Sequence, residues 1–441
     1  MLFNSYIFIF IFLPISMVIY NFKFGDVYKK IVFSSLLFYS YWNPSFLSIL
    51  CLSIVFNYYV SKKIKNKIAL TIAIIINIFV LGYYKYFNFI IDNVNSLLLI
   101  NIDNEKIFLP LAISFFTFQQ IAYLVDNYKN KLDYSFWQYA AFVSFFPQLI
   151  AGPIVHHNEI LPQIEKSHIK SENISKGSYF FSIGLFKKVV IADTFSLYVD
   201  NGYANYSTLT TIEAWVTSLS YSLQLYFDFS GYCDMAIGLA IIFGIKLPLN
   251  FNSPYKSLNI QDFWRRWHIT LGSFLRDYIY IPLGGNKKSK VFISMNLIIT
   301  FVIGGIWHGA GWTFVLWGLI HGLALVTHRA WSDSGLKIPN LLAILVTFSF
   351  INFTWVLFRA ENIEVAFTIL KTMCNITELN RDFEYTPILL TFTGLVVVFS
   401  VKNIHECEFK PSFFKAIIST ICFVSALILF TKESSFLYFN F

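Results

Sequence analysis

The stretch GGIWHGAGW, residues 304–312, places one histidine, His308, among glycines and tryptophans. The apolar runs 291–307 and 312–328 on either side are span-like, and glycines allow a helix to break between them. A break at membrane depth is tolerated only where the backbone is buried in protein or lines a cavity. Such surroundings disfavour the imidazolium, and a neutral ring can accept a proton. The pattern predicts a general base facing an internal cavity, although a core histidine hydrogen-bonded between two helices explains it equally well.

A second histidine, His268, lies in the stretch DFWRRWHITL, residues 262–271. If this segment is one helix, Trp264 and Arg265 share a face with His268, because they lie four and three residues before it. His268 is therefore a candidate second catalytic or orienting group. The simpler interpretation is an interfacial histidine on an amphipathic helix.

The same part of the chain carries its densest basic cluster. The basic residues there are Arg265, Arg266, Arg276, Lys287, Lys288 and Lys290. Such groups bind phosphate, so the cluster is suited to the mouth of a site for a phosphate-rich cytosolic donor such as coenzyme A. Anchoring to anionic lipid is the commoner use of basic clusters, and composition does not decide between the two interpretations.

Charged side chains also interrupt the apolar run around YFDFSGYCDMAIGLA, which contains Asp228 and Asp234. Intramembrane charges are rare and usually functional, but carboxylates near the end of a span also serve as structural pins. Structural pins are the preferred interpretation of the two aspartates. The pair Lys187-Lys188, in the separate string GLFKKVVIAD, is left open between a functional and an anchoring role.

The remaining histidines give weaker signals. His321 lies 13 residues after His308. On one continuous helix that spacing is about 220° around and roughly 20 Å along, so the two would not share a site. His156 and His157 have only Glu159 nearby in sequence, so no metal site is expected there. The five cysteines include no CxxC pair, which argues against zinc and against a disulfide framework.

The composition is that of a membrane protein. Of 441 residues, 56% are hydrophobic and 13% charged, whereas about a quarter of the residues in a soluble domain are charged. The net charge of +8 comes from Lys and Arg scattered in short loops between apolar runs. This distribution is typical of cytoplasmic loops and excludes a nucleic-acid-binding protein.

Apolar runs predict about 11–13 membrane crossings, with some short segments re-entrant. The candidate segments are 5–21, 31–42, 45–60, 68–90, 107–127, 135–151, 179–198, 211–227, 234–246, 291–307, 312–328, 339–358, 387–401 and 413–430. Basic loops follow the first, third and fifth segments, so the positive-inside rule places the N-terminus outside. The polar stretch 250–292 predicts one or two interfacial helices on the cytoplasmic face, followed by a Gly-Gly-Asn turn.

Six sequence motifs, which follow one another in the same order as in a known family, give the chain a resemblance to that family. They are LPLAISFFTFQQIAYLVDNY (109–128), FFPQLIAGPIV (145–155), GLFKKVVIAD (184–193), YFDFSGYCDMAIGLA (226–240), DFWRRWHITLGSFLRDYIYIPLGGN (262–286) and GGIWHGAGWTFVLWGLIHG (304–322). Together they resemble the membrane-bound O-acyltransferase (MBOAT) family, in particular its branch of bacterial polysaccharide O-acetyltransferases. The resemblance extends from about residue 30 to residue 330 and fades after that. Gly272 and Cys233 stand where the branch commonly has Ser, and neither change removes a group that the chemistry needs.

The resemblance implies an all-α polytopic fold of tilted helices around a central tunnel. His308 matches the family's invariant histidine, and His268 matches a position occupied by Asn, Asp or His in other branches. His321 also matches a histidine of the branch, without an implied role. The donor implied is acetyl-CoA, entering from the cytoplasm near the segment 262–288. The expected donor-binding residues are Trp264, Arg265, Arg266, Arg276 and Trp307.

The sequence thus predicts one integral-membrane acyltransferase domain over 1–441, with a core at 30–330 and C-terminal helices at 338–430. His308 is expected to act as general base on an acceptor hydroxyl, and His268 to assist it. Acetyl would cross the bacterial inner membrane for O-acetylation of a cell-envelope glycan, most simply peptidoglycan, with an extracytoplasmic transferase as partner and no bound cofactor. The alternatives are acetylation of alginate or another exopolysaccharide, export of D-alanine to teichoic acid, and a non-enzymatic transporter or flippase.

Overall fold

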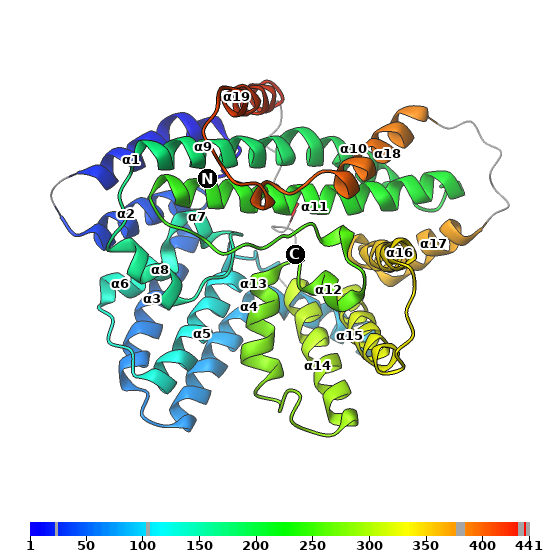
Figure 1. The fold of residues 1–441 in the computed structure, drawn as a ribbon. Helices are drawn as coiled ribbons and strands as arrows, with labels where there is room; N and C mark the ends of the chain where they lie inside the picture. The colour runs from blue at the N-terminus through cyan, green and yellow to red at the C-terminus, as the bar shows by residue number, and fades with distance from the viewer. Residues whose placement is uncertain (23–24, 103–105, 376–383, 431–435, 438–441) are drawn as a thin grey trace. The chain divides into compact units, whose positions relative to one another are not determined.

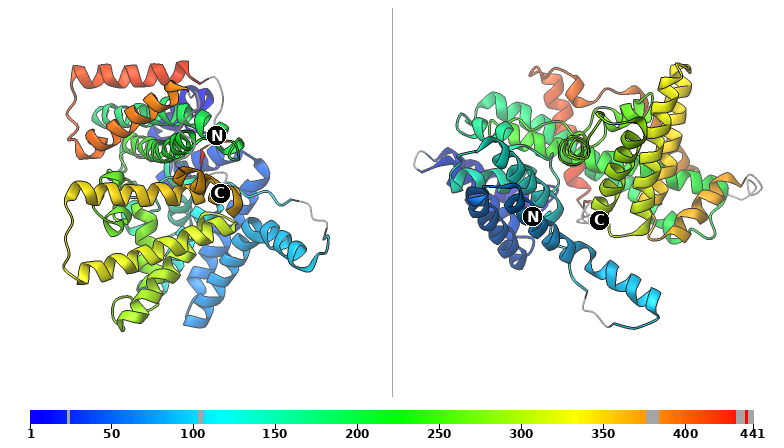
Figure 2. Two further views of the ribbon diagram at one scale, coloured as in Figure 1. Left: turned by 90° about the vertical axis from the view of Figure 1, so that its right-hand side faces the viewer. Right: turned by 90° about the horizontal axis from the view of Figure 1, so that it is seen from below.

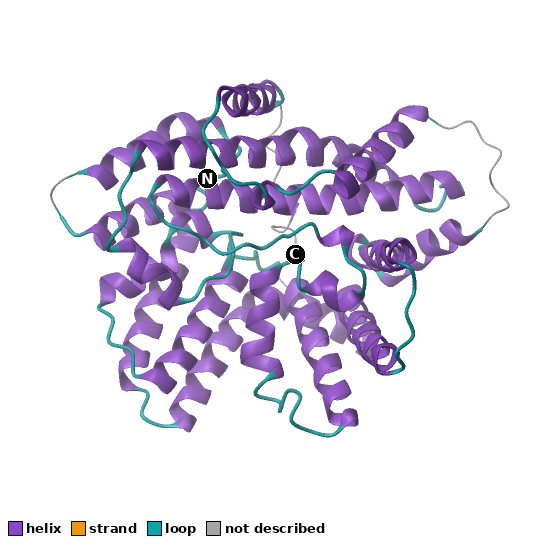
Figure 3. Cartoon of the chain, in the orientation of Figure 1, coloured by secondary structure: helices purple, strands orange, loops and turns teal. Residues whose placement is uncertain are grey.

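The computed structural model describes residues 1–22, 25–102, 106–375, 384–430 and 436–437, and its regular elements in these ranges are all helices (Figure 3). The chain divides into two compact units, which are described separately. Unit 1 comprises Met1–Leu185, Tyr232–Pro248 and Pro411–Asn440. Unit 2 comprises Phe186–Gly231 and Leu249–Lys410. The sequence-based description as one domain stays a prediction.

Unit 1 holds the N-terminal helices and the last helix, labelled in Figure 1. These elements are η1 (Phe8–Phe12), α1 (Leu13–Asn21), α2 (Val27–Ser40), α3 (Pro44–Lys63), α4 (Lys67–Leu98), α5 (Ile113–Asn130), α6 (Phe136–Ser144), α7 (Phe146–Leu149), α8 (His157–Ile164), α9 (Ser171–Phe186, whose last residue begins unit 2) and α19 (Phe413–Ile428). Asn43 and Asn66 start α3 and α4, because each side chain accepts a hydrogen bond from a free backbone N–H of the first turn. Phe3, Phe8 and Phe38 form an aromatic core with ring centroids 4.9–5.8 Å apart.

Unit 2 contains the elements that carry the predicted chemistry. They are η2 (Lys187–Ala192), α10 (Asp193–Ala204), the first part of α11 (Thr211–Ile242), η3 (Pro254–Lys256), α12 (Ile260–Trp264), α13 (Ile269–Leu275), η4 (Arg276–Tyr280), α14 (Lys290–His308), α15 (Trp312–Asp333), α16 (Asn340–Arg359), α17 (Ile363–Cys374), α18 (Tyr385–Ser400) and η6 (Ile404–Glu406). Tyr255 links three of them: its hydroxyl donates to the Ser222 carbonyl oxygen at 2.7 Å and accepts from Trp355 Nε1 at 3.2 Å.

Helices α14, α15 and α16 pack in sequence as antiparallel neighbours in unit 2. The left view of Figure 2 shows α15 and α16 side by side, joined at one end by their loop. An ion pair of 2.8 Å between Lys290 Nζ and Asp333 Oδ2 joins the start of α14 to the end of α15. His308 and Arg359, the last residues of α14 and α16, therefore both lie toward the end of this three-helix layer that is opposite Lys290.

Membrane-crossing segments agree with the predicted all-α polytopic class. Six described helices are long and apolar enough to cross a membrane: α3, α4, α11, α14, α16 and the helical stretch Tyr385–Glu406 that includes α18. The shorter apolar helices Phe8–Asn21 and Phe413–Ile428 add two candidates. The expected 11–13 crossings therefore include several segments that are too short or too polar to span alone.

Two predicted segments are wrong in detail. The spans 211–227 and 234–246 are one unbroken helix, α11 (Figure 1), and 94% of its most apolar window is buried inside the protein. Its polar residues face protein neighbours, so they do not mark a break. The span 135–151 is instead two helices, α6 and α7, because Pro147 in the first turn of α7 cannot continue the helix before it.

The polar stretch 250–292 forms four short helical elements, η3, α12, α13 and η4, in place of the expected one or two helices. The predicted Gly-Gly-Asn turn is present. Gly284 and Gly285 have φ angles of 115° and 52°, which only glycine adopts readily.

Candidate active site

His308 is the last residue of α14, and the helix breaks there as the glycines predict. Gly309 and Gly311 are extended, and α15 starts at Trp312. The His308 side chain is buried, with the residue 4% exposed. The chain thus leaves one apolar helix and enters the next within three residues, with His308 held at the inner end of the hairpin.

Two glycines allow α14 and α15 to approach closely beside His308. A Cβ atom on Gly305 would lie 2.3 Å from the Phe314 carbonyl oxygen, and one on Gly318 would lie 2.4 Å from the Phe301 carbonyl oxygen. Neither position can hold a larger residue without moving a backbone. Small residues at facing positions are how membrane helices pack tightly.

Aromatic rings enclose the His308 imidazole. The ring centroids of Trp307, Trp317 and Phe358 lie 5.0, 5.2 and 5.1 Å from that of His308. The fourth neighbour is His268, at 6.3 Å. All five rings belong to unit 2. The structure therefore brings together three of the predicted site residues, His308, His268 and Trp307, in one box of buried rings.

His268 occupies a chain reversal and not the middle of a helix. Helix α12 ends at Trp264, and His268 is the N-cap of α13 with a left-handed φ of 45°. The prediction that Trp264 and Arg265 share a helical face with His268 is wrong, since the 3.6-residue repeat stops before His268. A non-glycine residue in this conformation costs free energy, and such strain is concentrated at functional sites.

Asn250 holds this reversal in place. Its backbone carbonyl oxygen accepts from Ile269 N at 3.1 Å, and its Oδ1 accepts from Thr270 N at 3.1 Å and Thr270 Oγ1 at 2.7 Å. The His268 ring is fully buried and packs edge-on against Phe229 with centroids 4.8 Å apart. Burial lowers the pKa of His268, which lies outside the six span-like helices, to about 3.

His321 is linked to His308 through Trp317. The Trp317 centroid lies 5.2 Å from that of His308 and 4.6 Å from that of His321. The sequence argument that His308 and His321 share no site assumed one continuous helix. The break after His308 folds α15 back along α14, so the two histidines contact the same indole.

Hydrogen bonds fix the tautomer of His321. Thr354 Oγ1 donates to the Ile351 carbonyl oxygen at 2.9 Å, so its contact with His321 Nε2 at 3.1 Å must be one in which the imidazole N–H donates. His321 Nδ1 then accepts from Trp264 Nε1 at 3.3 Å. Both ring nitrogens are engaged, so the geometry suits a positioning role for His321 and not proton transfer.

The predicted basic cluster is partly neutralised by neighbouring carboxylates. Arg266 Nε donates to Asp262 Oδ1 at 2.9 Å, and Arg276 makes two hydrogen bonds to Asp277, at 2.7 and 3.0 Å. Arg265 is exposed and makes no side-chain ion pair with a described residue. Among the predicted donor-binding residues, Trp264 packs against Trp317 and His321, with ring centroids 5.7 and 5.2 Å apart. The Trp317 ring therefore lies between Trp264 and His308 in this series of contacts.

Asp228 has a structural partner. Lys188 Nζ lies 2.7 Å from Asp228 Oδ1 and 2.7 Å from Asp193 Oδ1, and the Lys188 and Asp228 side chains are 4% and 2% exposed. This ion-pair network, in unit 2, supports the interpretation of Asp228 as a structural pin and assigns Lys188 the same role. Asp234 is also buried, at 2% exposure, but belongs to the part of α11 in unit 1.

His156 and His157 both face Asp126 in unit 1, with nitrogen–oxygen distances of 3.7 and 3.6 Å. The neighbouring Glu159 instead accepts a hydrogen bond from the His156 backbone N–H at 2.9 Å. Among the residues described by the structure, no group of His, Cys, Asp and Glu has an arrangement suited to a metal ion.

Sequence reasoning missed several residues of the site. Phe229, Asn250, Trp317 and Phe358 contact or hold the two histidines, and Thr354 holds His321. Trp317 and Phe229 carried a signal, because both lie in strings that support the family resemblance, Trp317 in the same glycine-rich string as His308. The others are ordinary residues of apolar helices or loops, and only their contacts mark them.

Comparison with known proteins places this arrangement in a family. Residues 36–334 match the membrane-bound O-acyltransferase family. A peptidoglycan O-acetyltransferase of Helicobacter pylori is 49% identical over 85% of this chain and 80% of its own length. A probable alginate O-acetylase, AlgI, of Pseudomonas aeruginosa is 38% identical over 86% of this chain and 77% of its own. A teichoic acid D-alanyltransferase of Bacillus subtilis is 27% identical over 57% and 69%. The chain is a multi-pass membrane acyltransferase that belongs to the membrane-bound O-acyltransferase family.

Proposed function

We propose that this acyltransferase takes acetyl groups from cytoplasmic acetyl-CoA and passes them across the bacterial inner membrane for O-acetylation of peptidoglycan. The observation that carries the proposal is the close packing of His268 and His308 in one buried aromatic box. The choice of peptidoglycan rests on the relative from Helicobacter pylori, which is 49% identical over most of this chain.

In the proposed reaction, His308 is the general base. Its imidazole takes the proton of an acceptor hydroxyl while that oxygen attacks the carbonyl carbon of the thioester. The carbon–sulfur bond then breaks, the acetyl group stays on the oxygen, and the proton held by His308 passes to the departing thiolate. General-base help of this kind contributes about 10²–10⁴ in rate.

His268 and Arg265 support this chemistry in the proposal. His268 stands beside His308 as a neutral, preorganised ring that can orient the acceptor or stabilise developing charge. Arg265 is an exposed guanidinium without an ion pair to a described residue, which suits a first contact with the phosphates of the donor. Arg266 and Arg276 would have to break their ion pairs with Asp262 and Asp277 before they could bind the phosphates of the donor.

The proposal includes a partner outside the cytoplasm. An extracytoplasmic transferase would receive the acetyl group and place it on the glycan, since the glycan lies on the side of the membrane opposite the donor. No bound cofactor is part of the proposed cycle.

The test is acetyl-CoA turnover by the purified protein in nanodiscs, measured for wild type, His308→Ala and His268→Ala. We expect His308→Ala to fold like wild type and to lose turnover by about 10²-fold or more. A folded His308→Ala protein with wild-type turnover would show that the base has been misassigned.

The D-alanyl alternative has an observation of its own, the 27% identity to the Bacillus subtilis teichoic acid D-alanyltransferase. The same nanodisc preparation should therefore also be given a D-alanyl carrier thioester. Turnover of that thioester with none of acetyl-CoA would replace the proposed donor.

A further inference from the structure

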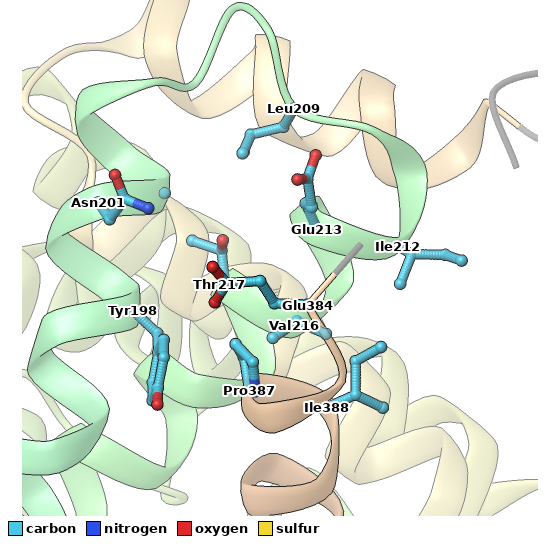
Figure 4. Close-up of a pocket in the computed structure, with 11 residues that line it drawn as sticks. Tyr198, Asn201, Leu209, Ile212, Glu213, Val216, Thr217, Glu384, Pro387 and Ile388 are labelled. Atoms are coloured by element: carbon cyan, nitrogen blue, oxygen red, sulfur yellow. The ribbon is translucent and has the colours of Figure 1, made fainter. Parts of the chain in front are cut away.

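A pocket lies in unit 2, between α10, the start of α11 and the start of α18. Its volume is about 250 Å³, which is room for several water molecules at about 30 Å³ each or for one long polar side chain. Figure 4 shows the lining side chains gathered around the opening. None of them belongs to the box around His308, so this pocket is a separate site.

Packing between the three helices fixes the pocket's walls. Gly202 on α10 meets Thr217 on α11 so closely that an added Cβ would lie 2.2 Å from Thr217 Oγ1. Helix α18 is held on α11 by a hydrogen bond of 2.9 Å between Ser220 Oγ and Thr391 Oγ1. The cavity is therefore a built feature of the helix packing.

The charged side chains that line the pocket are acidic, and the neutral polar ones include Asn201 and Thr217. Glu213 and Glu384 contribute carboxylates, and the lining contains no Lys, Arg or His among the described residues. In Figure 4 the Glu384 carboxylate extends from α18 toward Thr217. Thr217 is 4% exposed and makes no side-chain hydrogen bond to a described residue, so a buried hydroxyl also faces the cavity. Tyr198 adds an aromatic ring to the wall.

One carboxylate oxygen of Glu213, Oε2, accepts hydrogen bonds, and the other, Oε1, accepts none from a described residue. Glu213 Oε2 accepts from Thr210 N and Thr210 Oγ1, each at 2.8 Å, which caps α11. The capping bonds hold the carboxylate in a fixed position at the rim. A ligand that donates hydrogen bonds to Glu213 Oε1 and to Glu384 would meet two acceptors of the same charge.

An ion pair of this chain shows which cation a carboxylate and a tyrosine ring on α10 bind together. Next to the pocket, Arg359 NH2 lies 2.8 Å from Asp200 Oδ1, and the guanidinium lies 5.0 Å from the Tyr203 ring centroid. The pocket offers the same combination, a carboxylate with a tyrosine on α10, but no guanidinium of this chain among the lining residues. Carboxylate and aromatic face together favour the planar guanidinium of arginine.

The pocket lies toward the end of unit 2 that is opposite the lysines at the start of α14. Arg359 ends α16 opposite Lys290, and its partner Asp200 directly precedes the pocket residue Asn201. The positive-inside rule assigns Lys287, Lys288 and Lys290 to the cytoplasm. The pocket therefore lies toward the end of unit 2 that this rule assigns to the extracytoplasmic side, and its α18 wall lies beyond residue 334, where the family match ends.

We propose that this pocket binds an arginine side chain of an extracytoplasmic protein partner. The partner's guanidinium donates to Glu384 and to Glu213 Oε1 while it stacks on Tyr198. A short series of residues connects the pocket with the rings around His308. Asp200, next to the pocket residue Asn201, pairs with Arg359, and Phe358, which precedes Arg359, contacts His308 with ring centroids 5.1 Å apart. The partner assignment rests on the proposed function, whereas the recognition of a guanidinium does not.

The direct test uses the full chain in nanodiscs with Nα-acetyl-arginine amide as probe and the neutral, equally large Nα-acetyl-citrulline amide as control. Saturation-transfer NMR is suited to weak binding of this kind. We expect saturable binding of the arginine probe that weakens about tenfold in Glu384→Gln and in Glu213→Gln, the loss of about 1.4 kcal/mol given by one charge-assisted hydrogen bond. The amide oxygen that Glu213→Gln introduces can still cap α11, and Glu364→Gln on neighbouring α17 serves as the matched control with wild-type binding.

Three outcomes would overturn the assignment. Equal binding of arginine and citrulline probes would show that charge is not recognised. Arginine binding unchanged in Glu384→Gln would place it elsewhere, and binding of N-acetylglucosamine in place of arginine would make this a carbohydrate site. None of these measurements involves acetyl transfer, so they stand apart from failure of the proposed function.

The partner's role is tested in cells that carry Glu384→Gln. We expect glycan O-acetylation to fall while acetyl-CoA turnover by the purified variant stays at the wild-type level. Unchanged glycan acetylation would contradict a docking role. If the purified wild-type protein showed no acetyl-CoA turnover, that result would contradict the proposed donor. It would leave the measurements with the arginine probe unaffected.

Discussion

The rings of His268 and His308 lie with centroids 6.3 Å apart and planes tilted by 59°, although the two residues are 40 positions apart in the chain. Each is held at a helix end, His308 at the last residue of α14 and His268 at the N-cap of α13. Side chains at helix ends leave the helical repeat, so two such ends can meet without a steric clash between helix backbones.

The close approach of α14 and α15 is expected to be essential for the site. In Gly318→Ala the new Cβ would lie 2.4 Å from the Phe301 carbonyl oxygen, so the helices must separate. Overpacking of this kind costs about 1–3 kcal/mol and moves Trp317 relative to His308. We expect lower thermal stability in detergent together with reduced acyl transfer. Gly82→Ala is the control, because nothing lies within 4 Å of its Cβ, and an equal loss in both variants would contradict the argument.

His321 is expected to act through Trp264 and Trp317. Thr354→Val removes the acceptor of the His321 Nε2–H at 3.1 Å but keeps the shape of the side chain. A buried donor left without its partner costs about 1–3 kcal/mol. We expect kcat to fall by about tenfold or less with KM for the acyl donor nearly unchanged, and an unshifted pH profile. A shifted pH profile in Thr354→Val would show that His321 exchanges protons in the reaction.

Lys188 is expected to be needed for stability and not for chemistry. Its removal in Lys188→Met leaves the carboxylates of Asp193 and Asp228 without the ammonium that lies 2.7 Å from each. Breaking a buried pair in this way costs about 3–5 kcal/mol. We expect a strongly reduced thermal midpoint, partly restored in the double variant Lys188→Met with Asp228→Asn. A stable but inactive Lys188→Met protein would point to a catalytic lysine.

Stability should depend on the protonation of His268. Its pKa is about 3 in the folded protein and about 6.5 in an exposed imidazole, so the unfolded chain binds more protons between these values. Burial of the neutral His268 ring therefore lowers the free energy of unfolding progressively as the pH falls from 6.5 toward 3. Above pH 6.5 the ring is neutral in both states, and this loss is absent. Thermal unfolding in detergent at pH 7.5 and pH 4.5 measures this. His268→Gln should show the smaller loss on acidification, and an equal loss in both proteins would contradict the assignment.

Local sequence determined the class of the protein, most helix positions and the break at His308. Apolar runs of about 20 residues must be helical in lipid, because every backbone polar group has to be satisfied within the segment. The glycines of GGIWHGAGW allow the turn, α14 begins and ends within one residue of the predicted limits, and α15 begins at the predicted residue. These are properties of neighbouring residues, so they can be predicted without long-range contacts.

Tertiary structure alone decided which side chains meet. Periodicity carried across residues 264–268 predicted one helix, but contacts with Asn250 reverse the chain there and turn His268 toward His308. Polar residues of α11 suggested a break, but burial among other helices gives them partners such as Lys188 for Asp228. In both places the interaction that decides the structure comes from a distant segment, and its free energy outweighs the local preference.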